Sequence, residues 1–196
     1  LGNLTKASFK FELPSTNLKI TNVNENATEI FTGFLKYSQV LPKPTLSENR
    51  HFGEAAYKIV QTERKQVPLS NNIGNSGEFK LTNAVPLELV FKSNTAVLDL
   101  NLKKLRVSAL QVDSKAGSIN VIFPKDFSTR AYFLTQASLI KLTIPKENGV
   151  SLKIDSSFKS LKLDSERFKK FDKANYKSTN FDTSQIKIEI EISGSA

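Results

Sequence analysis

The stretch AGSINVIFPK at residues 116–125 returns as ASLIKLTIPK at residues 137–146. Each copy opens with small residues, continues with apolar residues at alternate positions and closes with Pro-Lys. Alternation with period two is typical of a β-strand that buries one face. A repeat of about 20 residues indicates units that bury their apolar faces only by stacking on one another. The sequence therefore predicts coils of β-strand, each lying on the one before.

The alternating pattern extends on both sides of the repeat. Apolar residues alternate through 87–91 and 98–102 before it, and through 150–154 and 186–192 after it. We expect each coil to hold three or four short strand segments. Small residues would stack at one corner, where Ala96 marks a third coil in register with Ala116 and Ala137. The isoleucine-rich strand at 186–192 is expected to cover the last coil.

These patterns predict an all-β fold, a β-solenoid-like stack of short strands, with a β-sandwich as the alternative. A chain of 196 residues is long enough to bury about 70% of its unfolded surface in one core. We therefore expect a single domain over 1–196, with an irregular N-terminal half (1–77) and a regular repeat region (78–192). Within the first half, Pro42 and Pro44 predict an irregular loop that runs to about Gly53.

Composition limits the classes of site that the chain can carry. There are 28 Lys and Arg against 19 Asp and Glu, a net charge of +9, which favours polyanionic neighbours. The charges are spread along the chain, so most are expected on the outward faces of strands, where they discourage edge pairing. The chain has no Cys, which excludes disulfides and thiolate sites. No apolar run reaches the 18 or so residues of a membrane-spanning helix.

The absence of Met from the whole sequence predicts that a segment preceding Leu1 belongs to the primary product. A signal peptide, a lipoprotein leader or a membrane anchor would each fit. We therefore expect an extracytoplasmic location, either secreted or attached to a membrane through a removed N-terminal segment.

Catalytic patterns are not evident in the sequence. His51 is the single histidine, which excludes a metal site built from several His, and no Ser lies in a nucleophile-elbow pattern. No phosphate-binding loop or dinucleotide fingerprint is present. Aspartates occur mostly at strand ends and turns, where they serve backbone hydrogen bonds. We expect no enzyme activity, no cofactor and no metal.

One segment combines basic and aromatic residues. Between 167 and 177, five basic residues alternate with Phe168, Phe171 and Tyr176. The basic residues are Arg167, Lys169, Lys170, Lys173 and Lys177. Such a segment can bind an anionic surface; alternatively, the aromatic rings cap the end of the solenoid and the lysines point to water. A turn of helix or a hairpin is expected here.

Several of these stretches together resemble the bacterial toastrack family. They are FKL at 79–81, VPLEL at 85–89, LDLNLKKL at 98–105 and AGSINV at 116–121, followed by the tail at 176–192. This family includes the exported domains of LiaF-like cell-envelope stress proteins, also called cell-wall-active antibiotic response proteins. The resemblance covers 79–192 well and the first 62 residues loosely. It implies a single-stranded β-helix and a role in extracytoplasmic sensing or regulation through protein contacts.

The functional prediction is a non-enzymatic domain that works as an adhesin-like binding or regulatory module at the cell envelope. Its expected partner is another envelope protein or an anionic envelope surface, and no nucleic acid is expected. Two alternatives remain: a structural protein that assembles coil on coil, and a polysaccharide-active enzyme that would need two facing carboxylates in a cleft. The oligomeric state is left open.

Overall fold

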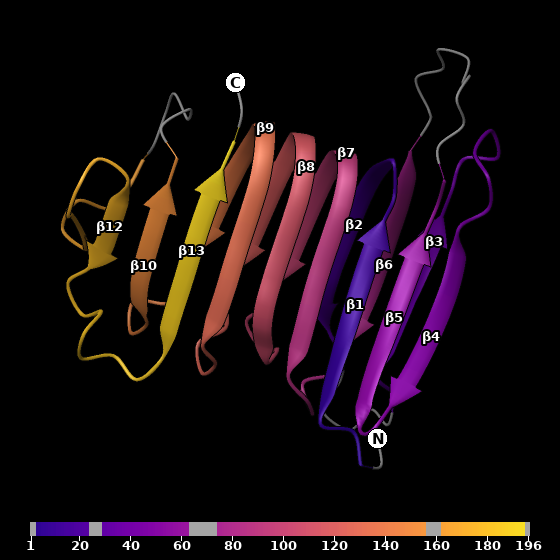
Figure 1. Cartoon of the computed structure of the whole chain (residues 1–196), viewed down its shortest axis with the longest axis horizontal. Helices are drawn as coiled ribbons and strands as arrows, with labels where there is room; N and C mark the ends of the chain where they lie inside the picture. Colours follow the sequence, from indigo (N-terminus) through magenta and orange to yellow (C-terminus); the bar gives the residue numbers. More distant parts are fainter. Residues whose placement is uncertain (1–2, 24–28, 63–73, 156–161, 195–196) are drawn as a thin grey trace.

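The computed structural model describes residues 3–23, 29–62, 74–155 and 162–194, and its described residues form strands and no helix. Figure 1 shows the strands side by side along the long axis of the molecule. The strands are β1 (Lys6–Glu12), β2 (Ser15–Asn22), β3 (Phe31–Lys36), β4 (Thr45–His51), β5 (Glu54–Val60), β6 (Asn75–Leu81), β7 (Leu87–Asn101), β8 (Val107–Ile122), β9 (Thr129–Thr143), β10 (Gly149–Ile154), β11 (Phe168–Lys170), β12 (Asn175–Ser178) and β13 (Lys187–Ser193).

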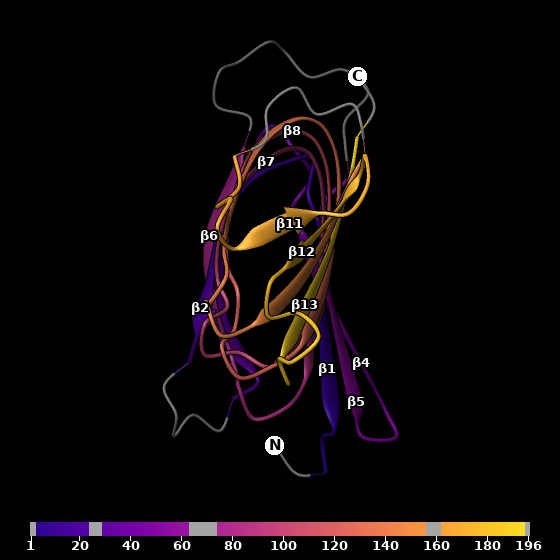
Figure 2. The ribbon, with the colours of Figure 1, turned by 90° about the vertical axis from the view of Figure 1, so that its left-hand side faces the viewer.

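Three long strands, β7, β8 and β9, bend midway and pass from one layer of the molecule to the other. The first half of β7 pairs with β1 and its second half pairs with β2. The front sheet therefore has the order β11-β12-β10-β13-β9-β8-β7-β1-β5-β4, and the back sheet the order β9-β8-β7-β2-β6-β3. Figure 2 shows the two layers end-on, joined by the arcs of β7 and β8. The fold is all-β and solenoid-like, as predicted, but the coils of β7, β8 and β9 each have one long bent strand and not three or four short segments.

The register of the repeat agrees with the sequence. Ala116 lies opposite Ala137, and the pairing continues to Ile122 and Thr143. The two Pro-Lys segments that follow are also neighbours, because the side-chain amide of Asn148 donates to the carbonyl of Pro124 at 2.8 Å and the Asn148 N–H donates to Pro145. The stacking of the coils is thereby confirmed.

The expected alignment of Ala96 with Ala116 is wrong by one residue. Thr95 lies opposite Ala116, and Ala96 lies opposite Gly117. The corner where the strands bend has a row of hydroxyl side chains two residues before the Thr95, Ala116 and Ala137 positions. They are Ser93, Ser114 and Thr135, which lie opposite one another on successive coils. The hydroxyls of Ser93 and Ser114 each donate to the carbonyl two residues ahead, at 2.8 Å. Local hydrogen bonds of this kind draw the backbone out of the extended form, so they contribute to the bends of β7 and β8, whereas the buried Thr135 hydroxyl of β9 has no hydrogen-bond partner.

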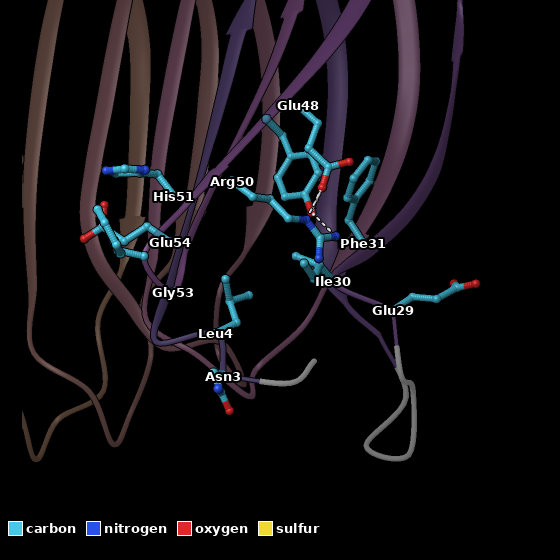
Figure 3. A pocket seen from close by; sticks show the side chains of 12 residues that line it. Asn3, Leu4, Glu29, Ile30, Phe31, Glu48, Arg50, His51, Gly53 and Glu54 are labelled. Carbon is cyan, nitrogen blue, oxygen red and sulfur yellow. Dashed lines mark hydrogen bonds and ion pairs between the residues drawn. The ribbon is translucent and has the colours of Figure 1, made fainter.

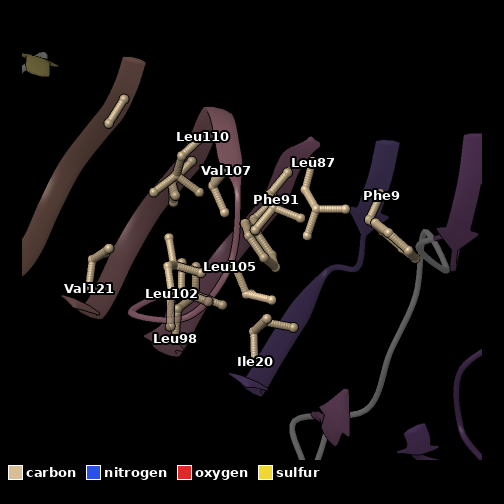
Figure 4. Close-up of a cluster of buried hydrophobic side chains, with 14 of the residues drawn as sticks. Phe9, Ile20, Leu87, Phe91, Leu98, Leu102, Leu105, Val107, Leu110 and Val121 are labelled. Atoms are coloured by element: carbon tan, nitrogen blue, oxygen red, sulfur yellow. The ribbon is translucent and has the colours of Figure 1, made fainter. Parts of the chain in front are cut away.

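The core lies between the two sheets and consists of rows of apolar side chains that run along the molecule (Figure 4). One row on the front sheet contains Phe11, Phe91, Val112 and Phe133. The rings of Phe11 and Phe91 stack with centroids 5.1 Å apart. Parallel neighbours place like side chains beside each other, so each coil buries the apolar face of the next.

The C-terminal strand does not cover the last coil, contrary to the sequence-based expectation. β13 lies between β9 and β10 and is parallel to both. β10 then pairs with β12, and β12 with β11, both antiparallel. The hairpin of β11 and β12 therefore forms this end of the front sheet, and the prediction of a hairpin near 164–177 is confirmed.

The other end of the front sheet is also a hairpin. The expected loop from Pro42 to Gly53 is wrong for most of its length, because β4 pairs antiparallel with β5 from Thr45 to His51. Every residue of β4 is exposed, so the strand has no apolar alternation by which the sequence could reveal it. In this register, Glu48 lies opposite Tyr57 and Arg50 lies opposite Ala55.

Candidate functional site

The β11–β12 hairpin carries the basic residues that the sequence identified. Lys169 and Lys177 lie directly opposite each other, whereas Lys170 lies opposite Tyr176. Because paired residues of antiparallel strands share a face, Lys169 and Lys177 belong to one face of the hairpin and Lys170 to the other. Phe168 and Tyr176 pack against the core, so Lys169 and Lys177 occupy the outer face.

Arg167 is separate from the other basic residues. Its guanidinium donates to the carbonyls of Ile144, Pro145 and Asn148 at 2.9, 2.7 and 3.0 Å. Burial lowers the pKa of Arg167, and the charges of Asp164 and Glu147 oppose that shift. Its donors are directed into the turn after β9, so Arg167 holds that turn against the hairpin and is not placed to bind a surface ligand.

Two aromatic rings and a third lysine complete the outer face of the hairpin. The Lys177 ammonium lies 5.2 Å from the ring centroid of Phe171 and 4.9 Å from that of Phe181. The Lys187 ammonium lies 4.6 Å from the centroid of the Phe181 ring as well. We call Lys169, Phe171, Lys177, Phe181 and Lys187 the lysine surface. Distances of this size are within the range of cation–π attraction.

Strand order brings Lys187 to this surface. Lys187 begins β13 and lies opposite Gly149, which shares a face of β10 with Ser151, the partner of Lys177. The loop that carries Phe181 packs directly on Gly149, where a β-carbon would approach the Phe181 backbone to 2.9 Å. Sequence reasoning missed Phe181 and Lys187; only the alternation of β13 could have assigned Lys187 an outward face.

The other two basic residues predicted from the sequence, Lys170 and Lys173, lie at the edge of the lysine surface. Lys170 stands over the Tyr176 ring, at 5.7 Å from its centroid. Lys173 is exposed in the turn between β11 and β12. Asp172 closes that turn by accepting hydrogen bonds from Ala174 and Asn175, and these bonds lower its pKa.

A second candidate site lies at the opposite end of the molecule. A pocket of about 660 Å³ opens between the β4–β5 hairpin and the start of β3, lined by residues that include Asn3, Leu4, Ile30 and Glu54. Figure 3 shows the side chains of Glu48 and Arg50 close to each other beside Phe31. The Tyr57 hydroxyl donates to Glu48 at 3.2 Å and accepts from Arg50 at 3.3 Å, and Arg50 also pairs with Glu48.

The charged and polar side chains of this pocket bond to one another. Arg50 lowers the pKa of Glu48. Burial, chiefly, raises the pKa of Tyr57, whose ring stacks on Phe9 at 5.0 Å and meets Phe31 edge-on at 4.9 Å. The polar groups satisfy one another at the mouth of an aromatic cluster, which is an arrangement for holding the hairpin and not for proton transfer.

Exposed apolar side chains lie on β3, on β4 and in the segments next to them, and one of these, Phe52, lines the pocket. Nine large apolar side chains are exposed among the described residues, and five of them belong to this end. They are Phe34, Tyr37, Val40, Leu46 and Phe52, and we call them the open end. Phe52 is 92% exposed and Leu46 58%. Exposed apolar residues that cluster mark contact surfaces, whereas scattered ones need no explanation.

A shallow groove of about 570 Å³ crosses the outer face of the front sheet from β7 to β12. A bulge at the start of β8, where Leu87 pairs with Val107 and Glu88 with Ala109, places the small Ala109 side chain in its floor. Two of its charged pairs, Arg130 with Glu189 and Lys153 with Glu191, are both at 3.0 Å. The charged side chains of the groove are therefore largely neutralised by their ion pairs.

Side chains able to bind a metal ion do not gather within the described ranges of the chain. Those ranges contain no group of three or more His, Asp or Glu side chains able to hold a metal ion. His51 is exposed at the end of β4, where its ring contacts Phe52. Among the described residues, no helix is long and apolar enough to cross a membrane.

The architecture is that of a two-faced β-solenoid whose front sheet is longer than its back sheet. Residues 1–132 match the family described as the N-terminal domain of toast_rack, so the chain belongs to the toast-rack family. The match includes the first half of the chain, which the sequence patterns related only loosely to the family.

One solved structure extends the likeness to nearly the whole chain. It is the crystal structure of a "putative cell adhesion protein" from Clostridium sporogenes, with a TM-score of 0.80 and 16% sequence identity. The alignment covers 99% of this chain and 91% of that one. At this identity the likeness shows a shared fold. A search of curated proteins finds no match to this chain.

Proposed function

We propose that this chain is a non-enzymatic binding domain that works outside the cytoplasm, at the bacterial cell envelope, through contact with another protein. The observation that carries the proposal is the open end, whose five exposed apolar side chains lie on β3, on β4 and in the segments that join β3, β4 and β5. Membership of the toast-rack family and the shared fold with a protein assigned to cell adhesion support an envelope role. More specifically, the domain has a regulatory role and senses envelope stress through that contact.

The open end fits a protein partner because it combines apolar side chains with a polar network. Leu46 and Phe52 supply apolar area, and Glu48 and Arg50 lie between them on or beside the same hairpin. Protein interfaces commonly have an apolar centre with polar groups at the rim.

Location is tested by protease treatment of intact cells that produce the full gene product. Extracytoplasmic placement predicts that added protease cleaves the domain before the cells are lysed, while a cytoplasmic protein in the same cells survives. Protection of the domain until lysis would contradict the proposed location.

The contact surface is tested by photo-crosslinking in the same cells. A benzophenone amino acid at Leu46 should give one discrete crosslinked protein, and the same group at Ser118, on the outer back sheet, should not. Phe52→Asp should abolish the Leu46 product. Equal crosslinking from both positions, or a product that Phe52→Asp leaves unchanged, would contradict a partner at the open end.

A further inference from the structure

We propose that the lysine surface binds the phosphate headgroups of an anionic lipid bilayer. This binding goes beyond the protein contact proposed above, because it involves the opposite end of the molecule and needs no partner protein. The argument uses the charges of the surface, its aromatic rings and its place in the fold.

The three lysines of this surface differ from three lysines elsewhere on the front sheet, each of which pairs with a glutamate. Lys6 pairs with Glu88 at 2.8 Å, Lys58 with Glu12 at 2.8 Å and Lys153 with Glu191 at 3.0 Å. Within the described ranges, no carboxylate lies within ion-pair distance of Lys169, Lys177 or Lys187. Their charges are therefore available to an external anion.

The acidic residues close to the surface neutralise little of this charge. Asp172 is occupied in its turn, where both carboxylate oxygens accept hydrogen bonds. Asp182 is exposed beside Phe181. Glu189, two residues from Lys187 on the same face of β13, is paired with Arg130 at 3.0 Å. The three lysines of the surface and Lys173 in the neighbouring turn outnumber Asp172 and Asp182, so the local charge is positive.

The aromatic rings favour a lipid surface over a soluble polyanion. Phe171 is 67% exposed at the edge of the hairpin turn, beside the Lys177 ammonium. An exposed aromatic ring flanked by lysines can enter the headgroup region of a bilayer while the ammonium groups contact phosphate. A free polyphosphate offers no apolar layer for that ring.

The position of the surface allows both ends of the molecule to be engaged at once. In Figure 1, β12 lies at the left end and β4 at the right end of the same long sheet. A domain that touches a bilayer through the hairpin of β11 and β12 would present its open end away from that bilayer.

Vesicle co-sedimentation tests the proposal with the purified domain. Vesicles of phosphatidylglycerol and phosphatidylcholine should bind it, and pure phosphatidylcholine vesicles should not. Added salt should weaken binding because it screens exposed charges. Each lysine near an anionic surface contributes about fivefold in affinity, so K169Q/K177Q/K187Q should bind about a hundredfold more weakly.

The matched control removes the same charge from the outer back face. Lys36, Lys80 and Lys141 are exposed on β3, β6 and β9, so K36Q/K80Q/K141Q has the same net charge as the test variant. It should keep most of the affinity. Equal loss in the two variants would overturn the proposal, since binding would then follow net charge alone.

Two further variants distinguish lipid binding from misfolding and from binding of a soluble polyanion. K169R/K177R/K187R keeps the charge and should keep the affinity, which excludes misfolding as the cause of loss. Phe171→Ser should weaken vesicle binding and leave binding of soluble polyphosphate unchanged. If Phe171→Ser binds vesicles normally and polyphosphate competes fully, the surface is a polyanion site and the lipid assignment is wrong.

Discussion

Gly117 shows how one residue can decide whether two coils fit together. Its φ of +140° lies in the region that favours glycine, and a β-carbon there would collide with the carbonyl oxygen and backbone nitrogen of Ala96 on the preceding coil. Ser138, which has the corresponding place in the repeat and lies opposite Gly117 on the next coil, carries a side chain. The small residues of the repeat are therefore not equivalent.

Gly117→Ala is expected to destabilise the fold by about 3 kcal/mol, because backbone strain adds to overpacking against Ala96. Urea denaturation measures this change in the free energy of unfolding. Gly74→Ala is the control, since a β-carbon there meets nothing closer than the Ser15 hydroxyl at 3.6 Å. Equal stability of the two variants would show that the close approach at Gly117 is not required.

Arg167 makes a second residue-scale prediction. Arg167→Ala would leave the carbonyls of Ile144, Pro145 and Asn148 without their charged donor, at a cost of about 2 kcal/mol. Arg167→Lys should recover only part of it, because an ammonium lacks the planar fork that reaches several carbonyls. Urea denaturation gives the order of stability. Vesicle binding by a folded Arg167→Ala protein should stay close to that of the wild type; a loss as large as in K169Q/K177Q/K187Q would mean that Arg167 belongs to the binding surface.

At the scale of strands, the sequence predicts those with one buried face and fails for the others. The repeat at 116–146 predicts the parallel register of β8 and β9, since matching apolar rows must align. β4 could not be predicted, because a strand exposed on both faces has no alternation. The insertion of β13 between β9 and β10 is not encoded by local pattern either, and without it Lys187 cannot be assigned to the lysine surface.

The insertion of β13 makes removal of that strand informative. A chain that ends at Gln185 loses the central partner of both β9 and β10. We expect β10, β11 and β12 to lose hydrogen-exchange protection, while β1, β7 and β8 keep theirs. Protection of β10 equal to that in the full chain would contradict the strand order. Shortening the chain only to Ser193 is the control and should leave protection unchanged.

At the scale of the whole molecule, the two ends of the solenoid do not match. The front sheet ends in the hairpin of β11 and β12 and in the hairpin of β4 and β5, and the back sheet ends in β9 and β3. The exposed edge at β4 also bears Glu48, Arg50 and His51, and charged edges resist pairing with a second copy. These features oppose end-to-end assembly, which is the structural-polymer alternative.

We therefore expect sedimentation at increasing concentration to give a monomer of 21.8 kDa. A sedimentation coefficient that keeps rising with concentration would favour the polymer. In that case Leu46→Lys should restore the monomer, because it adds charge to the apolar part of the edge.

The central claim is that the two ends of this molecule bind different partners: one end binds an anionic surface and the other binds a protein. The chain has no Cys, so one introduced thiol carries an environment-sensitive fluorophore at a chosen place. With anionic vesicles, a fluorophore on Ala174→Cys in the hairpin turn should shift to the blue and be quenched by spin-labelled lipid, and one on Asn49→Cys in β4 should not. A response at Asn49→Cys equal to or larger than that at Ala174→Cys would contradict the account.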